Sequence, residues 1–376
     1  MKILIVAPEQ IPVPPLKGGS VEICIYAIAR ELAKHHQVTV ISRTHPRYSQ
    51  VTKRGALTIK RVASGSSDIY LKSVLRAIKG TSYDWIQVDN RPRYAALIKR
   101  KAGKTPVSLF LHSLTFVQQP HASRSNAAEW LAEVDRIIAN SASLKKRLSA
   151  MFPTSRHKIK RVYLGTDVSR FRPASAAEKA KIRREMDVNG GFQVLFAGRI
   201  IRRKGIPVLI KAMHMARKQV PGAKLLIAGS EHRKGYKAQL RREAKRLSVP
   251  LRFLGNVPHG KVHHIYWLAD CFVCPSQKHE AFGLVNVEAM ASGLPVIASA
   301  NGGIKEIIKH GRSGIAVKAY RRPQAFAKSI VAVAHNRAWA GKLARQARID
   351  AVKRFSWQAT ARTLAACYRK KREGSS

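Results

Sequence analysis

Short apolar runs alternate with longer amphipathic stretches along the chain. In the first half these runs are rich in β-branched residues, and they span residues 2–7, 37–42, 57–62, 85–88, 107–112, 136–139 and 160–164. Between the first two runs, residues 20–35 place Cys24, Ile28 and Leu32 on one face at helical spacing. Several of the runs are apolar almost throughout, as strands are in parallel sheets covered on both faces. The pattern therefore predicts a doubly wound α/β domain.

A second series of the same kind fills the other half of the chain. Its apolar runs span residues 193–197, 224–228, 251–254, 271–274, 296–298 and 315–317. The polar segment between the two series, which ends at Gly190 and Gly191, is predicted to be a linker. The closing stretch is helical in pattern and breaks at Phe355-Ser356-Trp357. We therefore expect two Rossmann-like domains, 1–172 and 173–354, and a C-terminal helix in 355–376.

Composition places the chain among ordinary globular proteins. It has 376 residues, of which 45% are hydrophobic, so it is too apolar for a disordered protein and long enough for two domains. Its four cysteines are too few for a disulfide framework in a chain of this length. The first apolar run is too short for a signal peptide, and none is long enough to span a bilayer. We expect a cytoplasmic protein.

The charge is strongly basic. Lysine and arginine number 70 and aspartate and glutamate 21, which gives a net charge of +49. The cations are spread from Lys145-Lys146-Arg147 to a tail at Arg369–Arg372 and do not form one block. Such a surface attracts polyanions without reading a sequence, and no zinc-finger, RNP-like or helix-turn-helix pattern accompanies it. Specific nucleic-acid binding is therefore not expected, whereas an anionic polymer, a membrane surface and a general basic background remain open explanations.

The first candidate site is the glycine pair Gly18-Gly19, between the first predicted strand and the first predicted helix. Ligands of open α/β sheets bind beyond the carboxyl ends of the strands, where a glycine turn brings backbone N–H groups to a phosphate. The segment has neither the Gly-x-Gly-x-x-Gly pattern nor the Walker pattern, which argues against dehydrogenases and P-loop enzymes. An ordinary strand-to-helix turn is the alternative.

The second candidate is the pair of cations Arg199 and Lys204, just after the first strand of the second series. Two cations at the carboxyl end of a strand can neutralise a diphosphate whose charge grows as it leaves. In so basic a chain, a solvated charge run is the alternative.

The third candidate is the segment from Glu280 to Glu288, which leaves a strand and enters a helix. Gly283 and Leu284 would offer free N–H groups to an anion at the start of that helix. The two carboxylates could accept hydrogen bonds from sugar or ribose hydroxyls. Because the whole chain has only 21 aspartate and glutamate residues, two of them at one strand-to-helix junction are not easily explained as ordinary solvent-exposed residues.

These segments together resemble glycosyltransferase family 4, whose members have the GT-B fold. The resemblance is carried by Gly18-Gly19, Gly198-Arg199 with Lys204-Gly205, Glu280 and Glu288 with seven residues between them, and Asn301-Gly302-Gly303 with Glu306. It implies two Rossmann-like domains with a cleft between them and a last helix that returns to the N-terminal domain. Residues 7–15 and Asn90-Arg91-Pro92 are also similar to members associated with the spore coat of endospore-forming bacteria.

The resemblance also implies roles for individual residues. Arg199 and Lys204 would bind the donor diphosphate, Glu288 the ribose and Glu280 the hydroxyls of the transferred sugar. Gly18, Gly19, Phe282, Gly283 and Leu284 would complete the donor site. His112, which composition alone would class as a core or loop histidine, would face the donor sugar as a catalytic residue together with Glu280.

The implied reaction is a retaining sugar transfer from a nucleotide-diphosphate sugar, with UDP-sugars favoured and no metal or other cofactor. The sequence contains no Asp-x-Asp triplet, which agrees with a metal-independent enzyme. The acceptor is unknown; an anionic wall or coat polymer and a lipid-linked acceptor are the candidates, with peripheral membrane or spore-coat association. The alternatives are a non-catalytic basic coat protein that keeps the fold, and a nucleotide-sugar epimerase.

Overall fold

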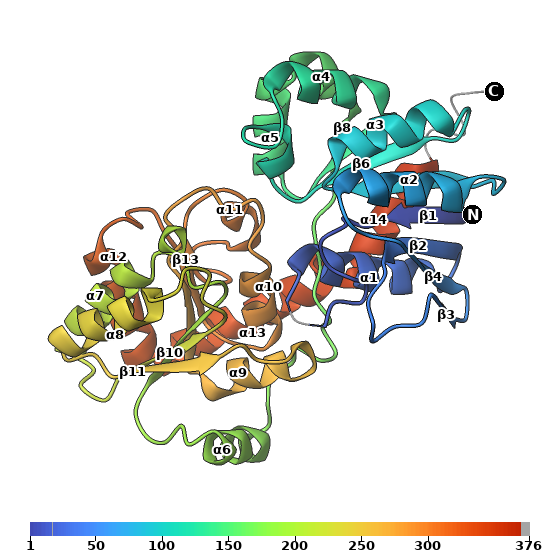
Figure 1. The fold of residues 1–376 in the computed structure, drawn as a ribbon. Coiled ribbons are helices and arrows are strands. Elements are labelled where there is room, and N and C mark those ends of the chain that lie inside the picture. Colours follow the sequence, from blue (N-terminus) through green and yellow to red (C-terminus); the bar gives the residue numbers. More distant parts are fainter. Residues whose placement is uncertain (17, 370–376) are drawn as a thin grey trace. The chain divides into compact units, whose positions relative to one another are not determined.

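The computed structural model describes residues 1–16 and 18–369, which form two compact α/β units. Unit 1 comprises Met1–Leu164 and the C-terminal segment that starts at Trp357, and unit 2 comprises Gly165–Ser356. Lys17, beside the glycine pair, and the basic tail beyond Arg369 lie outside the described residues. Figure 1 labels the elements of both units.

Unit 1 contains an eight-stranded sheet in the order β3-β4-β2-β1-β5-β6-β7-β8. Its strands are β1 (Lys2–Val6), β2 (Gln37–Arg43), β3 (Val51–Arg54), β4 (Leu57–Val62), β5 (Trp85–Asp89), β6 (Val107–Leu111), β7 (Arg136–Ala139) and β8 (Ile159–Arg161). Its helices are α1 (Ser20–Leu32), α2 (Ser67–Ile78), α3 (Pro92–Lys101), α4 (Arg124–Glu133), α5 (Ala142–Met151) and α14 (Trp357–Arg369), with short 3-10 turns η1 (Thr115–Val117) and η2 (Pro153–Lys158). Neighbouring strands are parallel except β3 and β4, which are antiparallel.

Unit 2 contains a six-stranded parallel sheet in the order β11-β10-β9-β12-β13-β14. Its strands are β9 (Gln193–Ala197), β10 (Lys224–Ala228), β11 (Leu251–Gly255), β12 (Cys271–Cys274), β13 (Val296–Ser299) and β14 (Ile315–Val317). Its helices are α6 (Ala176–Glu185), α7 (Ile206–Ala216), α8 (Tyr236–Arg246), α9 (Val262–Leu268), α10 (Leu284–Ala291), α11 (Ile304–Ile307), α12 (Pro323–His335) and α13 (Arg337–Arg354), with 3-10 turns η3 (Arg202–Lys204) and η4 (His259–Lys261).

The predicted parallel α/β architecture is confirmed in both units. Each run named above overlaps a strand. Most of these strands are buried on both faces, where no position favours a polar side chain, whereas β8 overlaps its run only at the exposed residues Lys160 and Arg161. The short strand β3 was not predicted. Most of its residues are exposed and it pairs only with β4, so it has no apolar pattern to reveal it.

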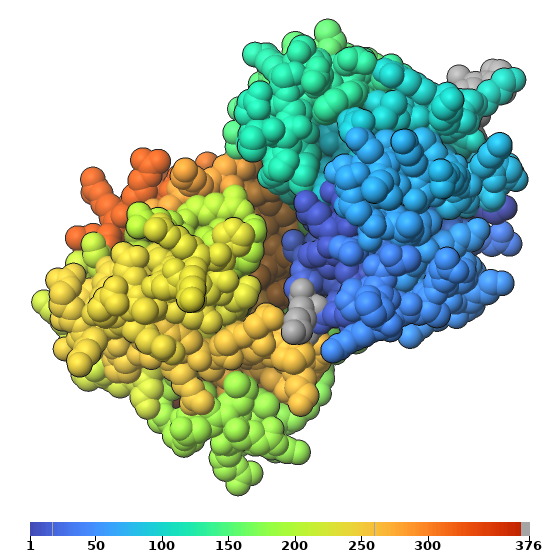
Figure 2. Space-filling view, in the orientation of Figure 1, coloured from blue at the N-terminus to red at the C-terminus, as the bar shows by residue number. Residues whose placement is uncertain are grey.

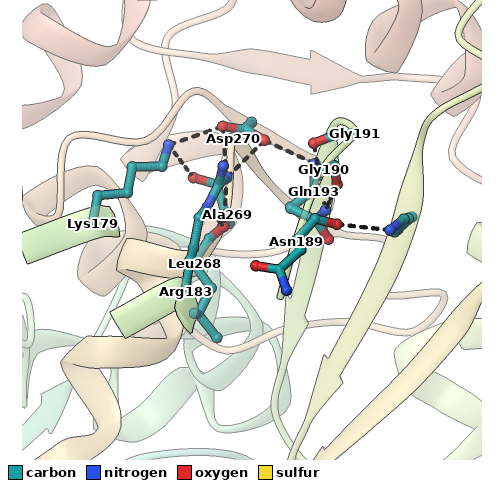
Figure 3. A network of polar contacts seen from close by, with 10 residues as sticks. Lys179, Arg183, Asn189, Gly190, Gly191, Gln193, Leu268, Ala269 and Asp270 are labelled. Carbon is teal, nitrogen blue, oxygen red and sulfur yellow. Dashed lines mark hydrogen bonds and ion pairs between the residues drawn. The ribbon is translucent and has the colours of Figure 1, made fainter. Parts of the chain in front are cut away.

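The predicted linker is wrong in one respect, because part of it folds as helix α6 on unit 2. Ser175 and Glu178 form a capping box at the start of this helix. Figure 3 shows that Lys179 and Arg183 of α6 bind Asp270, whose carboxylate also accepts a hydrogen bond from the backbone of Gln193. Asp270 precedes β12 and Gln193 begins β9, so one half-buried carboxylate ties the helix to two central strands. The polar composition of α6 concealed this packing.

The last helix packs within unit 1, as expected. Helix α14 contacts α1 (Figure 1). The ring of Tyr368 stacks on Trp85 of β5 with centroids 4.9 Å apart. In the space-filling view of Figure 2, the earlier residues of unit 1 cover this helix. Among the residues that the structure describes, no helix has the length and apolar character needed to cross a bilayer.

Candidate functional site

Each sheet reverses its strand order at one point, and the candidate residues gather at the carboxyl ends of the strands there. In unit 1 the order reverses between β1 and β5, and in unit 2 between β9 and β12. Loops that leave neighbouring strands in opposite directions open a crevice at such a point, and this crevice is where open α/β sheets bind ligands. The glycine pair follows β1, Arg199 follows β9, and Glu280 follows β12.

In unit 2 the structure brings Lys204 and Glu280 together. Lys204 Nζ lies 2.5 Å from Glu280 Oε2, and the two side chains are 15% and 24% exposed. Ser276 donates a second hydrogen bond to the same carboxylate oxygen, at 3.2 Å. The side chain of Arg199 has no ion pair or hydrogen bond among the described residues, so its guanidinium is available to a ligand.

Glu280 is held in its ionised form. Burial by itself would raise the pKa of this carboxyl, but the charge of Lys204 and its hydrogen bond outweigh burial and lower the pKa. An ionised carboxylate accepts hydrogen bonds and donates none, which suits it to bind hydroxyl groups. The same ion pair holds the ammonium of Lys204 beside the loop.

The loop that carries Glu280 rests directly on the segment Asn301-Gly302-Gly303. The backbone N–H of Gly303 donates to the carbonyl of Glu280 at 2.8 Å, and the amide of Asn301 donates to the carbonyl of Lys278 at 2.8 Å. Gly302 has φ of +54°, and a Cβ there would lie 2.0 Å from the Glu280 carbonyl oxygen. A glycine is therefore required at 302 for the loop to hold its position.

The start of α10 presents unsatisfied backbone donors beside this loop. Gly283 is its N-cap residue, and no side chain caps the first turn. The amides at this end, which include that of Leu284, are therefore suited to bind an anion. The ring of Phe282 is buried and packs edge-on against Phe355 with centroids 5.9 Å apart, so its side chain does not face a ligand.

Glu288 lies one turn inside α10 and has a partner in the protein. Tyr266 donates a hydrogen bond of 2.6 Å to Glu288 Oε2. Burial raises the pKa of Glu288, and the tyrosine hydroxyl opposes that rise. Tyr266 was not singled out in the sequence, where it is one aromatic residue among the apolar positions of α9.

In unit 1, Gly19 forms the N-cap of α1 with φ of +100°, and a Cβ there would lie 2.8 Å from a carboxylate oxygen of Glu22. Glu22 is only 4% exposed, and burial raises the pKa of its carboxyl. A buried acid therefore stands directly beneath the glycine turn. Sequence reasoning did not identify it, because Glu22 occupies a position on the apolar side of a helix.

His112 follows β6 and is held from several sides. Its Nε2 lies 2.8 Å from Asp89 Oδ1, and its backbone N–H donates to Asn90 Oδ1 at 2.9 Å. The imidazole also stacks on Phe110 with centroids 4.6 Å apart. The side chain of His112 is 8% exposed and that of Asp89 is fully buried. The structure therefore pairs the predicted histidine with an acid that the sequence analysis had not named.

A chain of buried hydrogen bonds continues from Asp89. Gln87 donates from Nε2 to Asp89 Oδ2 at 2.8 Å, and Tyr368 donates from its hydroxyl to Gln87 Oε1 at 2.5 Å. Asp89 and Gln87 lie on the same face of β5, since strand side chains alternate. The C-terminal helix thus helps to fix the acid that fixes the histidine.

The Asn90-Arg91-Pro92 segment shapes a neighbouring cavity. Arg91 binds both oxygens of Glu9 at 2.8 and 2.9 Å, and its guanidinium lies 4.0 Å from the centroid of Phe116. A cavity of about 260 Å³ opens beside this pair, and Tyr94, Phe116, His121 and Trp130 are among its lining residues. The loop after β1 is therefore joined to the start of α3 by a bidentate ion pair.

Comparison with known proteins identifies relatives of both units of the chain. Residues 18–170 match the model described as Glycosyltransferase Family 4, and residues 178–353 match the one described as Glycosyl transferases group 1. The chain is 28% identical to "Spore coat protein SA" of Bacillus subtilis strain 168, over 99% of this chain and 100% of that protein. It is 30% identical to "D-inositol 3-phosphate glycosyltransferase 1" of Catenulispora acidiphila, over 75% of this chain and 70% of that protein.

Solved structures of the same fold were also found. The sucrose-phosphate synthase of Thermosynechococcus elongatus superposes with a TM-score of 0.82 at 23% identity, and each chain is covered completely. The Anabaena protein HepE in complex with UDP superposes with a TM-score of 0.81 at 21% identity, over 98% of this chain and all of that one.

Proposed function

Because the chain belongs to glycosyltransferase family 4 and has the GT-B fold, we propose that it transfers a sugar from a UDP-sugar to an acceptor with retention of anomeric configuration. The observation that carries the proposal is the Lys204–Glu280 ion pair beside the uncapped start of α10. Cations and free amides bind a pyrophosphate well, and an ionised carboxylate is a strong acceptor of hydrogen bonds from sugar hydroxyls. This edge of unit 2 has both.

In the proposed reaction, negative charge grows on the leaving diphosphate while positive charge grows on the anomeric carbon. Arg199, Lys204 and the amides of Gly283 and Leu284 stabilise the leaving oxygen, which lowers the barrier because these groups are already oriented. Glu280 binds the hydroxyls of the transferred sugar. Glu288 binds the ribose, and Gly18 and Gly19 contribute backbone amides to the phosphates.

His112 is proposed to act at the reacting sugar. Its Nε2 is bound to Asp89, so the ring orientation is set before the donor arrives. A protein group that is already oriented needs no reorganisation in the transition state. We propose a front-face substitution in which the leaving phosphate and the acceptor occupy the same side of the sugar, with no metal ion and no other cofactor.

The choice of UDP rests on a related structure. HepE was solved with UDP, and the two chains share their fold. A thermal-shift screen across UDP-, GDP- and ADP-sugars tests the choice, since a bound donor raises the melting temperature with the logarithm of its saturation. We expect a UDP-sugar to raise Tm most. The proposal is abandoned if no nucleotide sugar raises Tm. If the reaction needs no metal ion, the rate of sugar transfer should be unchanged when EDTA is added.

For the acceptor we propose an anionic wall or coat polymer, or a lipid-linked precursor of one. Two observations support this: the net charge of +49 and the similarity to a spore coat protein over the whole chain.

We propose the cavity beside Arg91 and Phe116 as the place where a sugar ring of the acceptor stacks. Phe116→Ala should raise the acceptor KM and leave the donor KM unchanged. An equal change in both constants contradicts this placement.

Two other functions remain distinguishable by their products. A nucleotide-sugar epimerase returns a nucleotide sugar with altered stereochemistry and needs no acceptor. A non-catalytic coat protein releases no nucleoside diphosphate at all. Analysis of the products formed from labelled donor, with and without a wall-polymer extract, separates both from a transferase.

A further inference from the structure

A second concave site lies in unit 1 and is lined by cations. The cavity has a volume of about 630 Å³ and is bounded by β7, β8, α5 and α14 at the β8 edge of the sheet. Four of its eight lining residues are basic and none is acidic. The basic residues are Arg136, Lys145, Lys160 and Arg161.

None of these four cations has an ion-pair partner among the described residues. The nearest acid in the sequence, Asp135, is already bound to Lys99 at 2.9 Å and to the backbone N–H of Val107 at 2.8 Å. The positive charges that line this hollow repel one another, although Lys160 and Arg161, consecutive on β8, point to opposite faces of the sheet. Burying more of their surface makes the repulsion stronger. An anionic ligand would relieve this repulsion.

Two of the cations are held in position by aromatic rings. The guanidinium of Arg136 lies 5.6 Å from the centroid of Trp85, and that of Arg161 lies 4.5 Å from the centroid of Tyr163. Trp85 is itself fixed by its stacking on Tyr368 and its hydrogen bond of 2.9 Å to Ser108. Stacking restricts a guanidinium while leaving its N–H groups free, so less entropy is lost when a ligand binds.

The position of this cavity separates it from the proposed catalytic residues of the same unit. Arg136 begins β7 and pairs with Ser108, near the amino end of β6, whereas His112 follows the carboxyl end of β6. The cavity is also backed by small residues of α14, Thr363 and Ala366, which leave room above the helix.

We propose that this cavity binds a ligand carrying two or more phosphate groups. Guanidinium groups match phosphate oxygens in geometry, and the two lysines add charge without a fixed direction. The volume of this open hollow suits a short polyphosphate or the phosphorylated end of a larger molecule, rather than a duplex nucleic acid. The site does not depend on the proposed sugar transfer.

Calorimetric titration with inorganic tripolyphosphate tests the proposal. The first variant removes the four charges, as Arg136→Gln, Lys145→Gln, Lys160→Gln and Arg161→Gln. Its matched control removes four exposed cations of unit 2, as Lys211→Gln, Arg242→Gln, Lys245→Gln and Arg246→Gln. Neither set of substitutions changes Arg199 or Lys204, so any tripolyphosphate that binds at those two residues still binds to both variants. We expect the first variant alone to lose a binding event, or to bind about tenfold or more weakly.

A second variant fills the cavity without changing the charge. Ala366 is exposed on α14, and Ala366→Trp should block the hollow; Ala180→Trp on α6 is its control. This variant decides the question if the four-charge variant does not fold. Loss of tripolyphosphate binding in Ala366→Trp supports a built site. Unchanged binding in Ala366→Trp, or equal losses in a variant and its control, shows diffuse charge only and overturns the proposal.

Vesicles distinguish the two sources of phosphate. Phosphatidylcholine vesicles with and without cardiolipin, whose headgroup carries two phosphates, are sedimented with the wild-type chain and with Ala366→Trp. Binding that requires cardiolipin and is lost in the variant assigns the cavity to a lipid headgroup. Tripolyphosphate binding without such sedimentation assigns it to a soluble ligand.

Discussion

Lys204 and Glu280 are 76 residues apart in the sequence, and their charged atoms lie 2.5 Å apart in unit 2. Lys204 ends the 3-10 turn after β9, and Glu280 lies in the loop after β12. The two strands are adjacent and parallel, so their carboxyl ends bring the two loops together. The pair therefore depends on strand order and could not be obtained from either segment alone.

Lys204→Ala and Glu280→Gln should each lower kcat/KM by about 10²-fold or more, because each removes a group oriented toward the developing charge. Each also leaves its partner unpaired in a poorly hydrated place. Steady-state assays of UDP release measure the effect, with Lys211→Ala on the exposed side of α7 as control. The double variant should lose less than the sum of the two single losses. Additive losses would show that the two residues act separately.

Asp89→Asn should lower kcat by about 10²-fold while the donor KM changes little, because the amide no longer fixes His112 as the carboxylate does. The side chain of Asp89 is fully buried, so a structural effect must be separated from a positioning effect. The pH profile of kcat separates the two effects. If Asp89 positions His112, the pH dependence of kcat should differ between Asp89→Asn and the wild type. Asp68→Asn, on the exposed ion pair with Arg93, is the control. An unaltered profile with reduced Tm would assign Asp89 a structural role only.

Gly302→Ala should destabilise the chain by about 2–4 kcal/mol, since the residue has positive φ and its new methyl group would overlap the Glu280 carbonyl. At temperatures where the variant remains folded, its kcat/KM should still be reduced, because the added methyl group displaces the loop that carries Glu280. Gly311→Ala is the matched control: Gly311 has φ of +73° but no atom within 4 Å of the added Cβ. It should cost only about 1 kcal/mol. Similar melting temperatures for the two variants would show that the close contact is unimportant.

Acid should destabilise the chain partly through His263. Burial, followed by the charges of His264, Arg170 and Arg172, lowers its pKa from 6.5 to about 4, and only Asp167 opposes them. Between these two pH values the unfolded chain binds a proton that the folded chain does not, so stability falls as pH falls from 6.5 to about 4. After allowance for solvent screening we expect a contribution of about 1–2 kcal/mol.

His263→Phe keeps the aromatic contact with Trp267, whose ring centroid lies 5.0 Å away, and removes the titrating group. The difference in Tm between pH 7 and pH 5 should therefore shrink by a few degrees in this variant. His232→Phe, at an exposed position, should leave that difference as it is in the wild type. Equal acid sensitivity of His263→Phe and the wild type is the contrary outcome.

The chain sequence by itself determined most of the elements and the strand ends at which we propose that ligands bind. Apolar runs located the core strands because a strand covered on both faces excludes polar residues along its whole length. Gly18-Gly19, Arg199 and the segment from Glu280 to Glu288 stood out because each lies between such a run and the next helical stretch. The periodic spacing of apolar residues also predicted the C-terminal helices. The exposed strand β3 and the polar helix α6 have no such apolar pattern, so the sequence did not predict them.

Only the tertiary structure decided which side chains meet. Lys204 reaches Glu280, Tyr266 reaches Glu288, and Tyr368 reaches Gln87 through strand order and helix packing. Asp89 reads in sequence as the last residue of a buried strand, and only the neighbouring strand β6 makes it the partner of His112. Local sequence sets backbone preferences over a few residues, but a contact between distant segments depends on the register of the whole sheet.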